Sequence, residues 1–418
     1  MAADASGRRG LDGRRERRFR RRRGRAAAAV VAAGALAATA GAVGCAPLTP
    51  YGLPAGQAPP VMVLTRGAGN GNGDIFLTPV GGGYPSGPEI ITRTGKVIWF
   101  RPLPPGEVAT DFRTQTYRGR AVLTWCQLSG QGSRARWTDY IYNDRYQRIA
   151  RVTAGDGYAT DYHEFLITPW NTALITATRL ATVRLRSRTG WISQRVVDDV
   201  VQEIDIGTGK VLFQWNTIGH VPLRDSQVPR PASPATPWDW FHINAVHLDT
   251  DGNLLINSRY TWTTYKVNRR TGKIIWELGG KQSTFTLRAA PGQVLDRAGE
   301  IFAFQHDPEA LGNGEYTFFD DEAVPARSLL AYSRAVTVKL NLATRSATLV
   351  RSVKQPEGLL ATAQGNAQTT RNGDLFVDWG VLPYFSEFSP SGRLLLNIEF
   401  PPGVSSYRAY RLPWHPGR

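Results

Sequence analysis

Cysteine and methionine are scarce in this chain. Its 418 residues include two of each, which excludes a fold held by several disulfides and a zinc fold built on cysteines. Charged residues make up 20% and hydrophobic residues 42% of the chain, so a wholly disordered protein is excluded. No long stretch after residue 58 has helical periodicity, which argues against an α/β fold. Cys126 lies in an apolar stretch and is expected to be a free, buried thiol.

Glycine, proline and aromatic residues are abundant instead. The chain has 43 glycines, 27 prolines, 12 tryptophans, 15 tyrosines and 16 phenylalanines. Aromatic residues favour strands, whereas glycine and proline favour tight turns. The composition therefore predicts an all-β fold with many short strands, and the length allows one large core.

The net charge of +16 is concentrated at the N-terminus. Residues 1–25 hold eleven arginines and three acidic residues, so this short segment supplies +8. The rest of the chain mixes both signs and has no Lys/Arg cluster on a recognisable binding element. We therefore expect no nucleic-acid partner.

The first 45 residues have the pattern of an export signal. The basic stretch is followed by an uncharged run, rich in Ala, Val and Gly, over residues 26–44. This order is typical of a bacterial secretory signal or signal anchor. The run ends in Ala42-Val43-Gly44-Cys45, which resembles a lipoprotein processing site and makes Cys45 the candidate lipid acceptor. We expect export to the cell envelope, either anchored on the outer face of the cell membrane or secreted, with a Pro/Gly-rich tether over residues 46–58.

Two motifs alternate along residues 59–414, and each occurs six times. One is a turn before an apolar strand, which ends in Trp or Phe in its clearest copies; the copies begin at Thr94, Asp144, Thr208, Thr271, Thr344 and Ser391. The other is a turn, usually with Gly, before a second apolar strand; its copies begin at Gly71, Arg118, Pro169, Asp251, Asn313 and Asn372. Gly and Asn supply the positive φ angles of two-residue hairpins, so each unit is a pair of linked hairpins. Six such units predict a six-bladed β-propeller, and the lack of a fixed short period argues against a solenoid.

Three of the six histidines fall at one position of this repeat. His163, His242 and His306 lie seven to nine residues before the turn of the second motif. The strand before that turn opens a blade, and the opening strands of a propeller line its central channel. We therefore expect the three side chains to face one axis, with Arg259, at the end of the next strand after His242, as a fourth candidate. Polar groups gathered in a channel need partners or a ligand.

Amide side chains fall near the same position. Gln305 precedes His306, and the matching segment of the last blade carries Asn366 and Gln368. These three amides are the candidate substrate-binding residues. The other histidines share no repeat position and are interpreted as surface or packing residues: His220, His247 and His415.

Four segments together resemble the bacterial arylsulfotransferase family. They are Trp240-Phe241-His242-Ile243-Asn244, Asn257-Ser258-Arg259, Trp276-Glu277-Leu278-Gly279-Gly280 and Phe304-Gln305-His306-Asp307. The resemblance implies a six-bladed propeller in the cell envelope that moves a sulfuryl group from a phenolic sulfate ester to a phenolic acceptor. It implies no nucleotide sulfate donor and no cofactor. It also implies that His306 is the nucleophile that carries the group, that His242 and Arg259 form a catalytic pair, and that His163 is a further channel histidine.

The chemistry of sulfuryl transfer suits these residue types. The planar guanidinium of arginine binds oxyanions through two parallel hydrogen bonds. A protonated histidine can donate to the phenoxide leaving group, and a neutral histidine can attack sulfur to give a covalent intermediate. Three histidines and one arginine are therefore enough, without a metal ion.

Three other functions remain open from the residues alone. Three histidines can bind zinc and leave one position for water. A quinone-dependent dehydrogenase propeller is another possibility, although the sequence has no adjacent cysteine pair and no clear set of metal carboxylates. The alternative from a different class is a non-catalytic cell-envelope propeller that binds or scaffolds other molecules, and its channel would need no histidines.

Overall fold

The computed structural model describes residues 58–60, 62–67, 73–187, 190–324 and 327–417. The expected signal with Cys45, and all but the last residue of the expected tether, lie outside this part of the chain. The described residues form 28 strands and two short 3₁₀ turns, Gly132–Arg134 and Leu223–Asp225. Within them, no helix has the length and apolar character needed to cross a membrane. The all-β prediction is confirmed.

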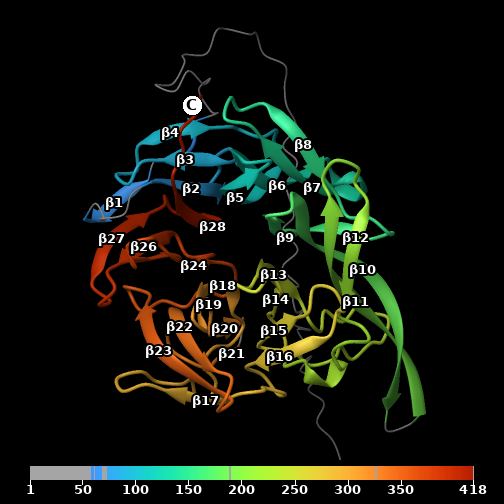
Figure 1. Ribbon diagram of the computed structural model, residues 1–418. Coiled ribbons are helices and arrows are strands. Elements are labelled where there is room, and N and C mark those ends of the chain that lie inside the picture. Colours follow the sequence, from blue (N-terminus) through green and yellow to red (C-terminus); the bar gives the residue numbers. More distant parts are fainter. Residues whose placement is uncertain (1–57, 61, 68–72, 188–189, 325–326, 418) are drawn as a thin grey trace, which may run out of the picture. The chain divides into compact units, whose positions relative to one another are not determined.

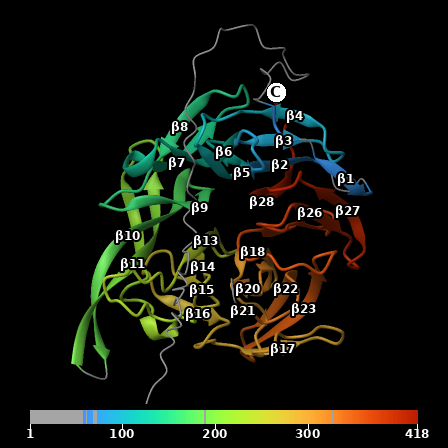
Figure 2. The same cartoon turned by 180° about the vertical axis from the view of Figure 1, so that it is seen from behind.

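Six sheets form the blades of a propeller, and Figures 1 and 2 show them from opposite sides. From the innermost strand outward, blade 1 contains β28 (Val404–Leu412), β2 (Asp74–Gly81), β3 (Glu89–Ile91) and β4 (Val97–Phe100). Blade 2 contains β5 (Val108–Tyr117), β6 (Arg120–Ser129), β7 (Arg136–Tyr142) and β8 (Arg148–Val152). Blade 3 contains β9 (Ala159–Ile167), β10 (Thr172–Ser187), β11 (Gly190–Asp205) and β12 (Val211–Asn216).

The other three blades repeat this order. Blade 4 contains β13 (Ile243–Leu248), β14 (Leu254–Ser258), β15 (Thr263–Val267) and β16 (Ile274–Leu278). Blade 5 contains β18 (His306–Gly312), β19 (Glu315–Asp320), β22 (Arg334–Asn341) and β23 (Ser346–Lys354), with β17 (Thr286–Ala289) parallel to β23 outside them. Blade 6 contains β24 (Asn366–Thr369), β25 (Leu375–Asp378), β26 (Tyr384–Phe388) and β27 (Leu394–Glu399), with β1 (Val63–Arg66) outermost. A separate hairpin consists of β20 (Ala323–Val324) and β21 (Arg327–Ser328).

The predicted turns recur at the same places of the repeat. The first motif connects the third and fourth strands in all six blades, and the second motif connects the first and second strands in blades 2 to 6. In blade 4, for example, Gly252 lies between β13 and β14 at φ +77°, and Gly272 lies between β15 and β16 at φ +69°. Glycine adopts this left-handed conformation without a side-chain clash. The prediction of six blades built from linked hairpins is confirmed.

The opening strand of blade 1 is the exception to the repeat. The strand that precedes its first turn is β1, which pairs with β27 at the outer edge of blade 6. The innermost strand of blade 1 is instead β28, from the C-terminal end of the chain. The two ends of the chain therefore close the ring, and β28 places C-terminal side chains in the channel.

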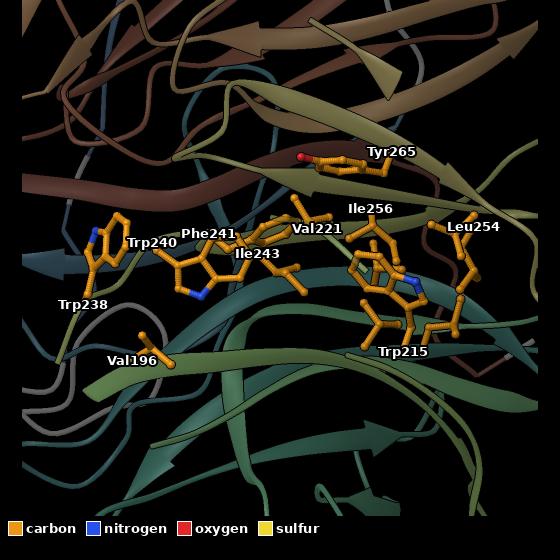
Figure 3. Close-up of a cluster of buried hydrophobic side chains, with 14 residues drawn as sticks. Val196, Trp215, Val221, Trp238, Trp240, Phe241, Ile243, Leu254, Ile256 and Tyr265 are labelled. Carbon is orange, nitrogen blue, oxygen red and sulfur yellow. The ribbon is translucent and has the colours of Figure 1, made fainter. Parts of the chain in front are cut away.

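Apolar side chains fill the spaces between neighbouring blades. Figure 3 shows the cluster between blades 3 and 4, which contains Trp215 from β12 together with Trp240, Phe241 and Ile243. Trp240 and Phe241 are fully buried and directly precede His242. Their packing fixes the segment that carries this histidine. Cys126, in β6, is buried and free, as expected.

Candidate active site

The three repeat histidines lie on the innermost strands of three consecutive blades. His163 is within β9, His242 immediately precedes β13, and His306 is the first residue of β18. The ring centroids of His163 and His242 are 4.9 Å apart. The main-chain N–H of Arg259 donates to the carbonyl of His242 at 3.0 Å. The structure therefore brings together the residues that the repeat placed on one axis.

A local irregularity in the strand pairing accompanies each histidine. The register shifts between Ile175 and Ala177 opposite the His163 segment, between Ile243 and Ala245, and between His306 and Glu309. His242 also has a left-handed backbone, with φ +59°. Bulges of this kind bend the strand and redirect a side chain. The regular alternation of a strand therefore does not set the direction of these histidines.

Each of the three histidines has its own aspartate at Nδ1. Asp239 Oδ2 is 2.6 Å from Nδ1 of His242, and Asp321 Oδ2 is 2.6 Å from Nδ1 of His306. Asp161 makes the corresponding contact with His163. In each ring Nε2 remains as the nitrogen available for chemistry. The repeat pattern did not indicate these aspartates, although two of them lie within three residues of their histidine.

His306 is buried, and its protonation state can be read from its contacts. The main-chain N–H of Gln364 donates to Nε2 at 3.3 Å, so the proton of the neutral ring lies on Nδ1 and points at Asp321. Burial lowers the pKa of His306 well below its ordinary value. The positive charges of Arg259 and Arg408 lower it further. His306 is therefore neutral near pH 7 and has a lone pair on Nε2.

The environments of the other two histidines differ. Burial lowers the pKa of His163, although the carboxylate of Asp161 opposes the shift. The ring of His163 stacks on Tyr162 at 4.0 Å. The side chain of His242 is 22% exposed, compared with 2% for His306. His242 is therefore the histidine of this group that meets solvent most directly.

Arg259 is a buried arginine that forms no salt bridge with a carboxylate among the residues that the structure describes. Its guanidinium donates to the carbonyl of Thr362 at 2.6 Å, and Nε has no hydrogen-bond partner. It is 4% exposed and lies 5.3 Å from the ring of Tyr260 and 5.2 Å from that of Phe304. Other buried arginines of the described chain each pair with at least one carboxylate: Arg113, Arg334, Arg408 and Arg411. An anion bound beside the histidines would supply the missing counter-charge of Arg259.

The three candidate amides lie in the packing between blades. Gln305 Nε2 donates to Asn257 Oδ1 at 2.8 Å, and Asn366 Oδ1 accepts from the main-chain N–H of Ala409 at 3.0 Å. Gln368 bonds both main-chain groups of Arg411. In the described part of the chain, no side-chain hydrogen bond joins these amides to the three histidines.

His247, interpreted from the sequence as a surface or packing residue, belongs to a second polar group in the channel. Its Nε2 lies 3.2 Å from Glu164 Oε2 and 3.2 Å from Asp307 Oδ1. With three further buried residues these form what we term the channel charge cluster: Asp111, Arg113, Glu164, His247, Asp307 and Arg408. Burial lowers the pKa of His247, but the carboxylates of Glu164 and Asp307 outweigh it and raise it to about 10. The cluster therefore contains three cations and three anions.

One set of described side chains has its atoms close enough together to hold a metal ion. It consists of Glu164, His247 and Asp307, and does not include the repeat histidines. Arg408 lies 3.0 Å from Glu164 and 3.4 Å from Asp307. Because a guanidinium already neutralises these carboxylates, the set does not fit a metal ion. The zinc interpretation of His163, His242 and His306 gains no support, since in the described part of the chain these three rings are not among the side chains whose ligand atoms lie close enough together to hold an ion.

Two cavities have linings that do not include the three repeat histidines. One, of about 690 Å³, is lined by side chains from several blades, including Arg113, His247, Glu309, Gln368 and Tyr410. The other, of about 1090 Å³, is lined mainly by blades 2 and 3 and includes Arg118, Arg120, Arg145, Arg151 and His415. Neither lining includes His163, His242, Arg259 or His306.

Comparisons with solved structures give low similarity. A protein of unknown function from Bacteroides caccae is 14% identical with a TM-score of 0.47, over 81% of this chain and 98% of that one. A structure described as the eukaryotic initiation factor is 9% identical with a TM-score of 0.32, over 84% and 90%. A variant of the GH43 protein BlXynB from Bacillus licheniformis is 12% identical with a TM-score of 0.33, over 73% and 58%. These likenesses carry no argument about function.

The comparison with family models is informative. No curated protein matches the chain. The model of the arylsulfotransferase (ASST) family matches residues 138–401, more than half of the sequence. This range includes the three repeat histidines and Arg259. The chain therefore belongs to the arylsulfotransferase family.

Proposed function

We propose that the protein moves a sulfuryl group from a phenolic sulfate ester to a phenolic acceptor through a sulfohistidine formed on His306. The observation that carries this proposal is the buried guanidinium of Arg259, which forms no salt bridge among the described residues, beside a neutral His306. A buried guanidinium without a counter-ion is costly unless a ligand supplies the negative charge. A sulfate monoester carries that charge on three equivalent oxygens.

In the first step, Nε2 of His306 attacks sulfur. The lone pair of Nε2 forms the N–S bond, and the bond between sulfur and the phenolic oxygen breaks with its electron pair on that oxygen. The main-chain N–H of Gln364, which caps Nε2 in the free protein, becomes available to a sulfuryl oxygen. Arg259 binds the other sulfuryl oxygens and neutralises the charge that spreads over them.

His306 becomes positively charged as the N–S bond forms, and Asp321 stabilises that charge. Nδ1 keeps its proton and donates it in a hydrogen bond to Asp321 Oδ2 at 2.6 Å. Burial raises the pKa of Asp321 well above its ordinary value. A more basic carboxylate interacts more strongly with the developing imidazolium, so Asp321 favours the intermediate.

His242 is the proposed proton donor to the leaving phenoxide. Asp239 binds its Nδ1, so the proton leaves from Nε2. Because the side chain of His242 is partly exposed, it can contact a phenol that enters from solvent. The acceptor then uses the same groups in reverse: its hydroxyl proton passes to His242, its oxygen attacks sulfur, and the N–S electron pair returns to His306. His163, held by Asp161, orients the substrate by a hydrogen bond.

We also propose that residues 1–45 direct export and that Cys45 carries a lipid. This proposal rests on the sequence pattern alone. Replacing Cys45 by Ala releases the protein into the medium if the anchor is a lipid on this residue. Unchanged retention in the membrane fraction would favour an uncleaved signal anchor.

The enzymatic proposal is tested by mixing the purified protein with 4-nitrophenyl sulfate and a phenol. We expect yellow nitrophenolate to form, with ping-pong kinetics in donor and acceptor. His306→Ala should abolish transfer while the fold survives, and His415→Ala, which changes an exposed histidine, should keep full activity. Wild-type protein that releases no nitrophenolate would favour the non-catalytic scaffold. Equal activity of His306→Ala and wild type would refute the role of His306.

A further inference from the structure

Arg408 contacts the channel strands of four other blades. It lies on β28 in blade 1 and is fully buried. Its Nη1 is 3.3 Å from Asp111 on β5, 3.0 Å from Glu164 on β9 and 3.4 Å from Asp307 on β18. Its Nη2 donates to the main-chain carbonyl of Asn244 on β13 at 2.9 Å. One side chain from the C-terminal strand therefore links five of the six blades at the axis.

The residues that Arg408 contacts on the three histidine strands lie close to the histidines in the sequence. Glu164 directly follows His163, and Asp307 directly follows His306. The carbonyl of Asn244 belongs to the second residue after His242. Each histidine strand is thus held by Arg408 within two residues of its histidine, in the region where the strand register shifts. Because the irregular backbone does not set the direction of these side chains by itself, an external contact is needed to fix it.

The surroundings of Arg408 favour a rigid arrangement. Arg113 and His247 bind the same carboxylates, so the three positive and three negative charges of the channel charge cluster are balanced. Tyr410 adds a hydroxyl that accepts from Arg408 at 3.1 Å and donates to Asp111 at 2.7 Å. A buried, balanced and hydrogen-bonded ion network tolerates little displacement of its members.

We propose that Arg408 is a positioning residue for sulfuryl transfer, which sets the relative placement of His163, His242 and His306 by binding the strand of each. This inference rests on the proposed function, and it goes beyond it by assigning a role to a residue that lies outside the four candidate site residues. Arg408 and its partners also occupy the channel beside the histidine strands. The cavity lined by Arg113 and His247 includes none of the histidines proposed to act in transfer, so we infer that substrates reach them from another side.

The first test compares Arg408→Met with Arg411→Met. Arg411 is a matched control because it is buried on the same strand and pairs with one carboxylate, Glu387, at 2.6 Å. Both variants should lose thermal stability. Only Arg408→Met should lose kcat, by about 100-fold, because misplacing reacting groups by about 1 Å has that effect. KM should change much less, since the substrate-binding guanidinium of Arg259 is untouched. An unchanged kcat in Arg408→Met, or an equal loss in Arg411→Met, would overturn the proposal.

Two further variants keep the test decisive if Arg408→Met does not fold. The double variant Arg408→Met/Asp307→Asn removes one charge of each sign and leaves two cations and two anions in the cluster. We expect it to fold and still to lose kcat by about 100-fold. Arg408→Lys keeps the charge but loses the planar fork, so its kcat should lie between those of Arg408→Met and wild type. Wild-type kcat in the folded double variant would contradict a positioning role.

A readout without turnover separates failure of this inference from failure of the proposed function. The groups that face His306 are Asp321, Arg259, His163, His242 and Arg408. Titration of labelled histidines by NMR should show His306 taking up its proton at higher pH in Arg408→Met than in wild type, because a positive charge that lowers its pKa has been removed. Arg408→Lys should titrate like wild type. If wild type transfers no sulfate but His306 shifts in this way, the proposed function fails and the link from Arg408 to His306 stands. An unshifted His306 titration in folded Arg408→Met would contradict that link.

Discussion

The histidine site and the channel charge cluster both bury ionisable groups on the same inner strands, but they balance charge differently. In the cluster, three cations lie within ion-pair distance of three carboxylates. At the histidine site, each of the three histidines contacts its own aspartate, whereas Arg259 donates to main-chain carbonyls and forms no salt bridge among the described residues. A propeller axis can therefore carry two kinds of polar group. In the cluster the arginines pair with carboxylates, whereas Arg259 at the histidine site has no such pairing among the described residues.

The largest expected effect comes from changing one arginine of each region. Arg259→Met should lower kcat/KM by about 100- to 1000-fold, because it removes a group that stabilises charge in the transition state. Its thermal midpoint should stay the same or rise, since the lost charge forms no salt bridge among the described residues. Arg113→Met should lower the stability by about 3–5 kcal/mol, because it leaves buried carboxylates without their partner. Activity assays and thermal unfolding of both variants test the comparison, and a strong loss of stability in Arg259→Met would contradict it.

A smaller effect is expected from the carboxylate that holds His306. Asp321→Asn should lower kcat by about 100-fold, because an amide can favour the tautomer with the proton on Nε2. The matched control is Asp139→Asn, a buried aspartate on β7 that contacts no histidine in the described structure. It should leave kcat unchanged. Steady-state kinetics of the two variants test this prediction. Equal losses of kcat in both variants would indicate a general effect of buried aspartates.

A further effect concerns the pH dependence of stability, and it differs in sign between the two regions. The pKa of His247 is raised from 6.5 to about 10. The stability that this histidine contributes to the fold is therefore complete below pH 6.5 and is lost as the pH rises through 10. The pKa of His306 is lowered, so the stability that it contributes is present above pH 6.5 and is lost as the pH falls.

Denaturant unfolding of wild type and His247→Gln measures this difference. The gap in unfolding free energy should narrow between about pH 7 and pH 10, by up to about 1.4 kcal/mol per pH unit. A gap that is constant over this range would contradict a protonated His247. Wild type should in addition lose stability below about pH 6.5, where the unfolded chain binds protons that buried His306 does not.

The fold was predictable because its signal repeats. Six copies of each turn motif determine where hairpins form, and the positions of His163, His242 and His306 before those turns place them on inner strands. The closing strand of blade 1 was not predictable from the repeat, since β28 is separated from β2 by more than three hundred residues.

The second polar group was not predictable for a different reason. Alternation along a regular strand directs His247 away from the channel, but the register shift after Ile243 changes the direction of the residues that follow. Asp321 was also not predictable as a site residue, because it follows β19 and contacts His306 only when the blade folds. Short-range patterns carry no information about such contacts between strands.

The central claim, that His306 carries the sulfuryl group, is tested most directly by locating the intermediate. The protein is mixed with 4-nitrophenyl sulfate without an acceptor, quenched under alkaline conditions, digested, and analysed by mass spectrometry. We predict an added sulfuryl group on the peptide that contains His306, and its loss when a phenol is supplied before quenching. A sulfuryl group on His242 or His163 would contradict the assignment of the nucleophile, and the absence of any sulfated peptide during active turnover would contradict a covalent mechanism.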